Sequence, residues 1–429
     1  MNRALPYKSS KEIRETQSQM LAEQLKYVME HSPFYRDHLA GCDVGAITTT
    51  GALSLLPVTT KAELQQRNMD FLCVEREQII DYITTSGTTG SPITFAVTEK
   101  DLERLADNEY ASFLCAGGSS SDIYQLMLTL DRRFMAGLAY FLGLRKLGAG
   151  IIRVGPGNAL LQFDTIRRTS PTVLVTLPSF LLKLIEFAEK NNIDLSQTSV
   201  KSAVCIGEPI RDSRFELNKL GRRIRSKWDI RLYSTYASTE MGAAFTECRE
   251  GKGGHLNPEM LVVEFLDDRD LPVKEGELGE VTITSLGVEG MPLVRFKTGD
   301  ICHHFTGECG CGRNTVRLGP IVGRKNQMIK YKGTTLFPPA FYEILNEIEG
   351  VDNYIVEVST NSIDTDDIEV IIGSRNHNPA LEKKIKDHFR AKLRVAPSIR
   401  FMDPKEVGKL QFPKMSRKPV TFIDKRNPA

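Results

Sequence analysis

The chain has 429 residues, which at about 100–200 residues per domain indicates roughly two to four domains. Hydrophobic residues make up 41% and charged residues 26%, an ordinary globular composition that excludes a disordered chain. The formal net charge of +2 gives no electrostatic basis for binding nucleic acid or an anionic membrane. Since no apolar run reaches about 20 residues and the polar N-terminus lacks a signal-peptide core, we expect a cytoplasmic protein.

The first hundred residues begin with a helical pattern. Residues 11–40 carry apolar side chains at helical spacing after a serine cap, and Pro33 is expected to end that helix. Residues 55–67 have the pattern of a loop followed by a capped helix. Residues 79–102 predict a strand, a loop rich in glycine, serine and threonine, a second strand, and a helix that begins at Thr98 or Glu99.

The predicted pattern of secondary structure changes twice in the rest of the chain. Between residues 105 and 205 apolar runs alternate with helical stretches, which predicts an open, largely parallel α/β sheet. From about residue 258 to 322 strands and turns predict a β-rich subdomain, and GPIVGRK at 319–325 has the pattern of a junction. The last hundred residues resemble a small α+β module.

The segment TTSGTTGSP, residues 84–92, packs six hydroxyl side chains and two glycines into nine residues. Glycine lets backbone N–H groups approach a ligand closely, and hydroxyls with free N–H groups suit an anion such as phosphate. The segment is not a Walker loop, because no Gly-Lys-Ser/Thr follows. A tight hairpin turn rich in serine and threonine is the alternative interpretation.

Four of the eight cysteines fall close together, at positions 248, 302, 309 and 311. Cys248 with His255, and Cys309 with Cys311, have the composition of a Cys₃His zinc site, which needs four nitrogen or sulfur ligands in a tetrahedron. Competing ligands are Cys302, His303 and His304. The alternative is a set of reduced thiols that bind no metal, and the other four cysteines have the pattern of ordinary reduced thiols.

Five segments in order carry a resemblance to a known family. They are TTSGTTGSP (84–92), YASTE (236–240), RFKTGD (295–300), GRK (323–325) with MIK (328–330) and Gly333, and Lys418. Together with HSPFYRDHL (31–39) and GEP (207–209), they resemble the adenylate-forming superfamily of acyl-CoA ligases and adenylation domains, and within it the phenylacetate-CoA ligase branch.

This resemblance implies an α/β fold with two parts. Residues 1–322 would form a large N-terminal adenylate-forming domain of mixed sheets and helices that includes the β-rich subdomain. Residues 323–429 would form a small, mobile α+β domain, with Lys325 as the hinge. The Cys248, His255, Cys309 and Cys311 set resembles a structural zinc site found in many members of the branch.

The resemblance also implies a site for ATP and Mg²⁺. Loop residues would hold the β- and γ-phosphates: Thr85, Ser86, Gly87, Thr88, Thr89 and Gly90. Flanking residues would border or stack on the adenine and its surroundings: Glu208, Pro209, Tyr236, Ala237 and Ser238. Thr239 would contact the α-phosphate and Glu240 would ligate Mg²⁺.

Other residues would contact the ribose and the reacting groups. Asp300 accepts hydrogen bonds, which suits ribose hydroxyls, and Arg324 would contact the ribose as well. Lys418 would bridge the substrate carboxylate and the α-phosphate, a task that suits a point charge on a flexible stem. Gly333 would reach the site in the second step.

The resemblance places the acyl pocket at Arg133, Phe134, Ala136 and Gly207. Phe134 matches an aromatic residue near the acyl group, and a basic side chain of Asp131-Arg132-Arg133 would pair with a polar substituent, unless this segment is an exposed charged turn. Two departures stand out: Ser91 occupies a position where the family often has lysine, and Pro-Val-Thr follows Lys418.

The implied activity has two steps. A small-molecule carboxylic acid, aryl or small organic, would attack the α-phosphate of ATP to give acyl-AMP, and a thiol of coenzyme A would then take the acyl group. Alternatives are an adenylating enzyme that loads a carrier protein or another acceptor, and a nucleotide-binding zinc protein without turnover. We expect no nucleic-acid or membrane partner and leave a homodimer open.

Overall fold

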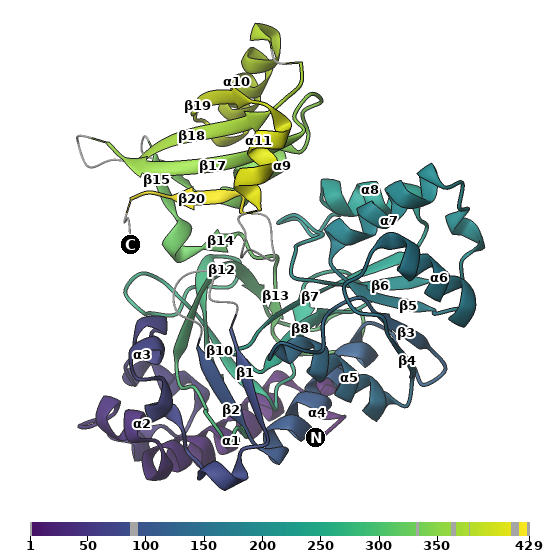
Figure 1. Cartoon of the computed structure of the whole chain (residues 1–429). Coiled ribbons are helices and arrows are strands. Elements are labelled where there is room, and N and C mark those ends of the chain that lie inside the picture. Colours follow the sequence, from purple (N-terminus) through teal and green to yellow (C-terminus); the bar gives the residue numbers. More distant parts are fainter. Residues whose placement is uncertain are drawn as a thin grey trace. The chain divides into compact units, whose positions relative to one another are not determined.

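The computed structural model describes residues 2–85, 93–331, 334–361, 366–376, 378–412 and 420–426. The chain forms two compact units, Met1–Ile321 and Val322–Ala429, and each is described by itself. Unit 1 contains the N-terminal helices, a small hairpin and a large mixed sheet, whereas unit 2 contains a separate small sheet with its own helices (Figure 1).

The N-terminal region of unit 1 is helical. Its helices are η1 (Leu5–Tyr7), α1 (Ser10–His31), α2 (Pro33–His38), η2 (Val44–Ala46), η3 (Thr50–Leu55), α3 (Lys61–Gln66), η4 (Asn68–Phe71) and η5 (Arg76–Gln78). Reciprocal side-chain and backbone hydrogen bonds between Ser9 and Glu12 cap α1. Pro33 does end the pattern of α1, but it also opens α2, because a proline at the first helical position loses no hydrogen bond.

A hairpin of β1 (Asp81–Thr84) and β2 (Thr94–Val97) precedes the long helix α4 (Glu99–Cys115). The predicted start of that helix is confirmed: Thr98 and Asp101 form a capping box.

The predicted parallel sheet is also confirmed. Its strands are β3 (Ile123–Leu126), β4 (Gly150–Arg153), β5 (Val173–Thr176), β6 (Ser202–Ile206) and β7 (Arg231–Ser238), paired in parallel in the order β4-β3-β5-β6-β7. The connecting helices are α5 (Met135–Leu147), α6 (Ala159–Thr169), α7 (Pro178–Lys190), η6 (Leu195–Gln197) and α8 (Lys219–Lys227). Helices α6, α7 and α8 lie beside β5 and β6 (Figure 1), and their apolar side chains share one buried cluster with those strands.

The β-rich stretch does not form a sheet of its own. Its strands are β10 (Leu261–Leu266), β11 (Leu278–Ser285), β12 (Phe296–Phe305) and β13 (Arg317–Leu318), and β8 (Ala243–Glu247) and β9 (Gly254–His255) come just before it. They continue the parallel sheet from β7 in the order β8-β9-β13-β12-β11-β10 with antiparallel pairing. One sheet therefore runs through unit 1, and β7 is the strand at which the pairing changes from parallel to antiparallel.

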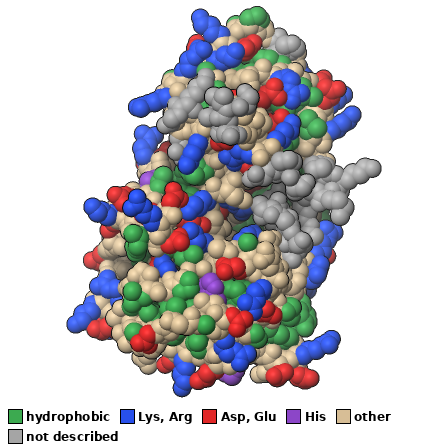
Figure 2. Space-filling model, turned by 90° about the vertical axis from the view of Figure 1, so that its left-hand side faces the viewer, with side chains coloured by type: hydrophobic (Ala, Val, Ile, Leu, Met, Phe, Trp, Pro, Cys, Tyr) green, Lys and Arg blue, Asp and Glu red, His purple; other side chains and the backbone are tan. Residues whose placement is uncertain are grey.

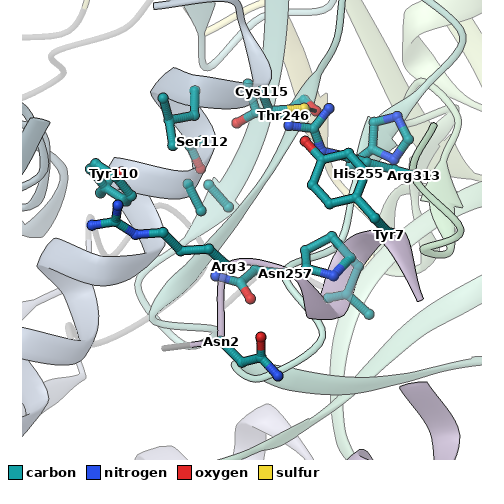
Figure 3. Close-up of a pocket in the computed structure, with 15 residues that line it drawn as sticks. Asn2, Arg3, Tyr7, Tyr110, Ser112, Cys115, Thr246, His255, Asn257 and Arg313 are labelled. Carbon is teal, nitrogen blue, oxygen red and sulfur yellow. Dashed lines mark hydrogen bonds between the residues drawn. The ribbon is translucent and has the colours of Figure 1, made fainter. Parts of the chain in front are cut away.

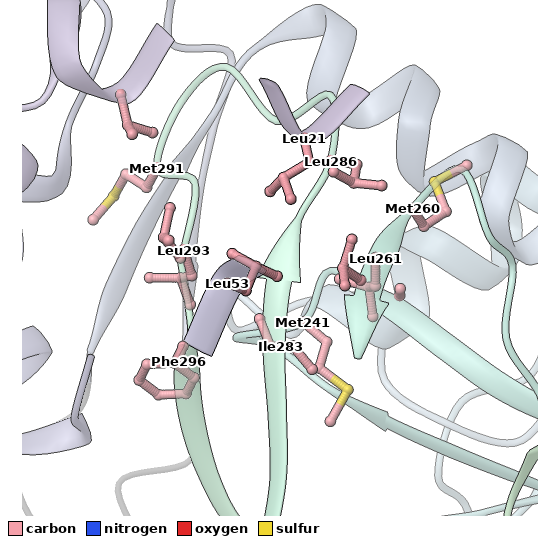
Figure 4. Packing of buried hydrophobic residues seen from close by; sticks show 14 of the residues in the cluster. Leu21, Leu53, Met241, Met260, Leu261, Ile283, Leu286, Met291, Leu293 and Phe296 are labelled. Carbon is pink, nitrogen blue, oxygen red and sulfur yellow. The ribbon is translucent and has the colours of Figure 1, made fainter. Parts of the chain in front are cut away.

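The largest apolar core of unit 1 joins the N-terminal helices to the antiparallel strands. Leu21 of α1 and Leu53 of η3 pack with Leu261, Ile283 and residues around them (Figure 4). Burial of these side chains stabilises the unit by about 25 cal/mol for each Å² of apolar surface removed from water. The N-terminal helices thus share one hydrophobic core with strands β10, β11 and β12.

Unit 2 has an α+β arrangement. Its elements are β14 (Gly323–Arg324), η7 (Lys325–Gln327), β15 (Ile329–Tyr331), β16 (Thr334–Leu336), α9 (Pro338–Leu345), β17 (Asn353–Thr360), β18 (Asp366–Gly373), α10 (Pro379–Leu393), β19 (Ser398–Met402), α11 (Pro404–Gln411) and β20 (Phe422–Asp424). Four strands pair in the order β19-β18-β17-β20. Phe341 of α9 and Phe389 of α10 pack under the sheet in a core of their own.

Among the described residues no helix combines the length and the apolarity needed to cross a bilayer. Basic and acidic side chains are interspersed on the face drawn in Figure 2, in keeping with the small net charge of the chain.

Candidate functional site

The carboxyl ends of the parallel strands gather several of the predicted residues, as is usual for ligand sites in open α/β sheets. Gly207, Glu208 and Pro209 follow β6 directly, and Gly207 has a φ of +72°, a conformation that glycine adopts readily. The Glu208 carboxylate accepts hydrogen bonds from the backbone N–H and the hydroxyl of Ser179, both at 2.8 Å. Ser179 lies at the start of α7, so the amino end of that helix fixes the acid.

Tyr236 and Asp300 meet although they belong to strands that are not neighbours. The Tyr236 hydroxyl, near the end of β7, donates a hydrogen bond of 2.7 Å to Oδ2 of Asp300 on β12. Burial and the neighbouring carboxylate raise the pKa of Tyr236 well above its ordinary value, so the hydroxyl keeps its proton. The pair offers an aromatic face and a buried carboxylate together, which suits a nucleoside: a ring to stack on the base and an acceptor for ribose hydroxyls.

The turn between β7 and β8 carries the residues expected at the α-phosphate and the metal ion. Ser238 Oγ accepts a hydrogen bond from Met241 N at 3.3 Å, and Gly242 N donates to the Thr239 carbonyl at 3.2 Å. Ala237 is exposed just before this turn. The Glu240 carboxylate is 12% exposed, and one of its oxygens lies 3.5 Å from Nζ of Lys61.

The predicted phosphate loop begins at the base of the β1–β2 hairpin. Thr85 closes that base: its N–H donates to the Ile93 carbonyl at 3.0 Å, and its hydroxyl accepts from Ile93 N at 3.1 Å. Five further loop residues of the prediction, Ser86, Gly87, Thr88, Thr89 and Gly90, lie outside the described residues.

The predicted acyl-pocket residues lie at the start of α5. Arg132 and Arg133 both have positive φ, +60° and +57°, which is rare for arginine and marks a strained turn. The Arg133 carbonyl accepts a hydrogen bond of 3.1 Å from Thr84 N, so this turn adjoins the strand that leads into the phosphate loop. Phe134 and Ala136 pack against the apolar cluster formed by α4, α5 and the parallel strands.

Two predicted residues belong to the described part of unit 2: Arg324 is exposed on β14, and Lys325 begins η7. Gly333 and Lys418 lie outside the described residues.

The four predicted metal ligands lie together. The ligand atoms of Cys248, His255, Cys309 and Cys311 all fall within 4.8 Å of one another. Cys248 Sγ is 3.7 Å from Cys309 Sγ, and Cys311 Sγ is 3.5 Å from Nε2 of His255. Cys302, His303 and His304 are not in this group; Cys302 is fully buried in the core behind β12.

Neighbouring side chains orient His255 and shift the pKa values of His255 and Cys311. Thr315 Oγ1 is 2.9 Å from His255 Nδ1, which orients the ring with Nε2 toward the thiols. Burial, together with Arg313 and Arg317, lowers the pKa of His255 to about 3, so the imidazole is neutral at pH 7. Although burial acts the other way, hydrogen bonds from Arg313 hold the pKa of the Cys311 thiol below its ordinary value.

A cavity of about 220 Å³ lies beside the cluster, and His255 and Arg313 line it. The N-terminal segment forms one wall: Arg3 lies over the Tyr110 ring at 4.8 Å, and Arg313 lies over the Tyr7 ring at 5.0 Å (Figure 3). None of the residues expected to bind the nucleotide lines this cavity.

Sequence reasoning missed three residues that hold predicted ones in place: Ser179, Thr315 and Lys61. A local signal exists for two of them. Ser179 follows Pro178 at a helix start, and Lys61 follows the capping residue Thr60. Neither pattern predicts that Ser179 contacts Glu208 or that Lys61 contacts Glu240.

Comparison with known proteins identifies the family of the chain. A sequence model of the family described as "AMP-binding enzyme" matches residues 15–290. The chain belongs to this family. As an AMP-binding enzyme it has the Tyr236–Asp300 pair and Glu240 at one edge of the sheet of unit 1.

The relatives of this AMP-binding enzyme confirm the resemblance to phenylacetate-CoA ligases. It is 28% identical over 376 residues to the phenylacetate-coenzyme A ligase of Pseudomonas putida, covering 85% of this chain and 82% of that protein. It is 29% identical over 362 residues to the enzyme of that name from Escherichia coli (strain K12), covering 81% and 79%.

A solved structure confirms the fold class. A 2-hydroxyisobutyryl-CoA ligase in complex with 2-HIB-AMP, in the postadenylation state, has a TM-score of 0.85 at 20% identity, covering 99% of this chain and 92% of that one.

Proposed function

We propose that the protein is an AMP-forming ligase that joins a carboxylic acid to the thiol of coenzyme A. The observation that carries this proposal is the Tyr236–Asp300 pair at the carboxyl edge of the sheet, with Glu208 and Glu240 in the adjoining turns. The phenylacetate-coenzyme A ligases at 25–29% identity support it.

In the first step the substrate carboxylate attacks the α-phosphorus of ATP. A new oxygen–phosphorus bond forms, the bond to the bridging oxygen breaks, and pyrophosphate leaves with the electron pair. Tyr236 and Asp300 hold the adenosine, and Thr239 contacts the α-phosphate. Since phosphoryl chemistry depends mainly on positioning and on stabilising charge, these contacts supply most of the acceleration.

Mg²⁺ fits the Glu240 carboxylate, because an ionised oxygen ligand beside a phosphate site is the kind it prefers. When bound, the ion would neutralise phosphate charge. Lys418 would bridge the substrate carboxylate and the α-phosphate in this step.

In the second step the thiol attacks the acyl carbonyl, AMP leaves, and a thioester forms. We propose that unit 2 reorients between the steps about Lys325, withdraws Lys418 and brings the Gly333 segment to the site, as hinge-gated enzymes do. Coenzyme A as the acceptor and the cytoplasm as the compartment are parts of this proposal.

The acid is an aryl or small organic one. Phe134 and Ala136 supply an apolar wall beside the parallel strands, and Gly207 leaves room at the end of β6. The exposed Arg133 next to them is placed to pair with a polar substituent on the acid.

ATP–pyrophosphate exchange across a panel of aryl and short-chain acids tests the proposal, followed by thioester detection with coenzyme A. We expect exchange with at least one acid and consumption of coenzyme A with that acid. The absence of exchange with every acid would exclude an adenylating enzyme. Exchange without consumption of coenzyme A would indicate a carrier protein or another acceptor instead.

We also propose that Cys248, His255, Cys309 and Cys311 bind one structural zinc ion. The donor set supports this, because three thiols and one neutral imidazole within 4.8 Å match a Cys₃His site. Metal analysis of the purified protein should give about one zinc per chain. Cys309→Ser/Cys311→Ser should lose the zinc and more stability than activity, while the control Cys42→Ser keeps both; unchanged zinc in the double variant would contradict this site.

A further inference from the structure

Lys61 brings a positive charge to the residue expected to hold Mg²⁺. Its ammonium lies 3.5 Å from the Glu240 carboxylate, with exposed side-chain fractions of 39% for the lysine and 12% for the acid. In the described part of the chain, Lys61 is the one basic side chain that pairs with Glu240. The lysine is partly exposed whereas the carboxylate is largely buried, so the ammonium reaches Glu240 from the solvent side.

The backbone around Lys61 is fixed to the strand that carries Asp300. Thr59 forms a parallel bridge with Phe296, at the start of β12. Its N–H donates to the Arg295 carbonyl, and its carbonyl accepts from Lys297 N, both at 2.9 Å. The Thr59 hydroxyl donates to the Val294 carbonyl at 2.7 Å. The segment before α3 therefore has a defined position relative to the nucleotide residues.

Two further contacts hold this position. Thr60 and Glu63 form a capping box, which places Lys61 at the first residue of α3. The Arg295 guanidinium, 2% exposed, pairs with Glu264 at 3.0 Å and donates to the Leu56 carbonyl. The segment that carries Lys61 is thus held in place by hydrogen bonds and an ion pair.

Another lysine on a neighbouring segment, Lys297, forms ion pairs with other carboxylates. Lys297, on the same strand as Asp300, pairs with Glu280 at 3.2 Å and with Asp270. The phosphate loop itself has Ser91 where lysine is frequent in similar enzymes. The segment 84–92 contains no lysine or arginine, and Lys61 is a cation that lies beside Glu240.

We propose that Lys61 is a catalytic residue that binds the β- and γ-phosphates of ATP, an inference that rests on the proposed function. With Mg²⁺ bound, Glu240 would hold the ion, and the Lys61 ammonium would contact phosphate oxygens instead of that carboxylate. Lysine suits this exchange because its charge is compact and its stem flexible. It transfers no proton; it stabilises the charge that collects on pyrophosphate as the α-phosphorus bond breaks.

AMP provides the discriminating comparison, because it has the adenosine and the α-phosphate but lacks the β- and γ-phosphates. Calorimetric titration of the full chain in Mg²⁺ should show Lys61→Ala binding ATP about 10–100-fold more weakly, the loss expected for a charged hydrogen bond. AMP affinity should stay within about twofold. Lys61→Arg should recover most of the ATP affinity, and the control Lys26→Ala, in an exposed pair on α1, should bind like the wild type.

Rates give a second readout. Pyrophosphate exchange by Lys61→Ala should fall, while thioester formation from preformed acyl-AMP should stay within about twofold, and the melting temperature should shift by no more than about 2 °C. Equal loss of ATP and AMP affinity, or a Lys61→Arg variant no better than Lys61→Ala, would overturn the proposal. A wild-type protein that binds neither nucleotide would instead refute the proposed function on which it rests.

Discussion

The Tyr236–Asp300 hydrogen bond links two strands that have three others between them in the sheet. β8, β9 and β13 separate β7 from β12, yet the hydroxyl and the carboxylate lie 2.7 Å apart. The protein's own hydrogen bond therefore orients the ring, and Asp300, a residue 7% exposed, has a donor for its buried carboxylate. Preorganisation of this kind reduces the entropy lost on binding.

Tyr236→Phe removes the hydroxyl and keeps the ring. We expect AMP to bind about 2–10-fold more weakly, the usual worth of one hydrogen bond, because the ring loses its anchor and a buried carboxylate loses a donor. Calorimetric titration with AMP measures this. Tyr82→Phe, at a 42% exposed tyrosine, is the control, and identical AMP affinity in both variants would contradict the role of the pair.

Individual residues also show how far sequence reasoning reaches. Asp300 and Glu240 could be proposed as site residues because their motifs, RFKTGD and YASTE, occur in order with three others, not because either carboxylate is informative alone. Ser179 and Lys61 could not be predicted. Ser179 reaches Glu208, and Lys61 reaches Glu240, only in the folded protein. The grouping of Cys248, His255, Cys309 and Cys311 was predictable because cysteine and histidine are such restrictive residue types.

Helix α4 supports the turn that carries Glu240 through buried polar groups. Its Arg104 donates to the carbonyls of Gly242, Leu286 and Met260, and its Asp101 accepts from Gly290 N at 2.9 Å. These bonds satisfy loop backbone that would otherwise be buried without partners. The capping box predicts where α4 begins. The buried polar face of α4 does not follow from apolar periodicity, so these hydrogen bonds could not be predicted from the sequence.

Glu109 on the same helix has no basic partner among the described residues, and its hydrogen bond comes from the neighbouring Asn108. Burial raises its pKa from 4.5 to about 8. Between those values the folded protein keeps a proton that the unfolded chain has lost. The contribution of Glu109 to stability is therefore complete below pH 4.5 and is lost as the pH rises to about 8.

Glu109→Gln should remove that dependence. Urea unfolding at pH 5.5 and 8.5 should show a decline in unfolding free energy that is smaller in the variant by roughly 1–3 kcal/mol. Glu103→Gln, at an exposed position of α4 paired with Lys146, serves as the control and should decline like the wild type. A decline of equal size in all three proteins would mean that Glu109 is ionised when folded.

For the whole molecule the division into Met1–Ile321 and Val322–Ala429 matters most. The predicted nucleotide residues lie on both sides of this division: Tyr236 and Asp300 belong to unit 1, whereas Arg324 and Lys418 belong to unit 2. The junction was visible in the sequence as a change of pattern near residue 320. The single continuous sheet of unit 1 was not, because the order β13-β9-β8 depends on pairing between distant short strands.

Lys418→Ala separates the two steps. Adenylation, measured by pyrophosphate exchange, should fall by at least about 100-fold, because the charge that bridges carboxylate and α-phosphate is lost. Thioester formation from preformed acyl-AMP should change little. Lys409→Ala on α11 is the control, and equal loss of both steps in the Lys418 variant would refute its role.

The Thr59–Val294 contact joins positions 235 residues apart, and this has a consequence for how the protein is made. During synthesis the helices at the N-terminus leave the ribosome long before the strands that cover Leu21 and Leu53 exist. Their apolar faces stay open for most of translation, a condition that invites aggregation and slows folding. The segment that presents Lys61 is thus synthesised early, but it cannot pack until the residues near 294 have been made.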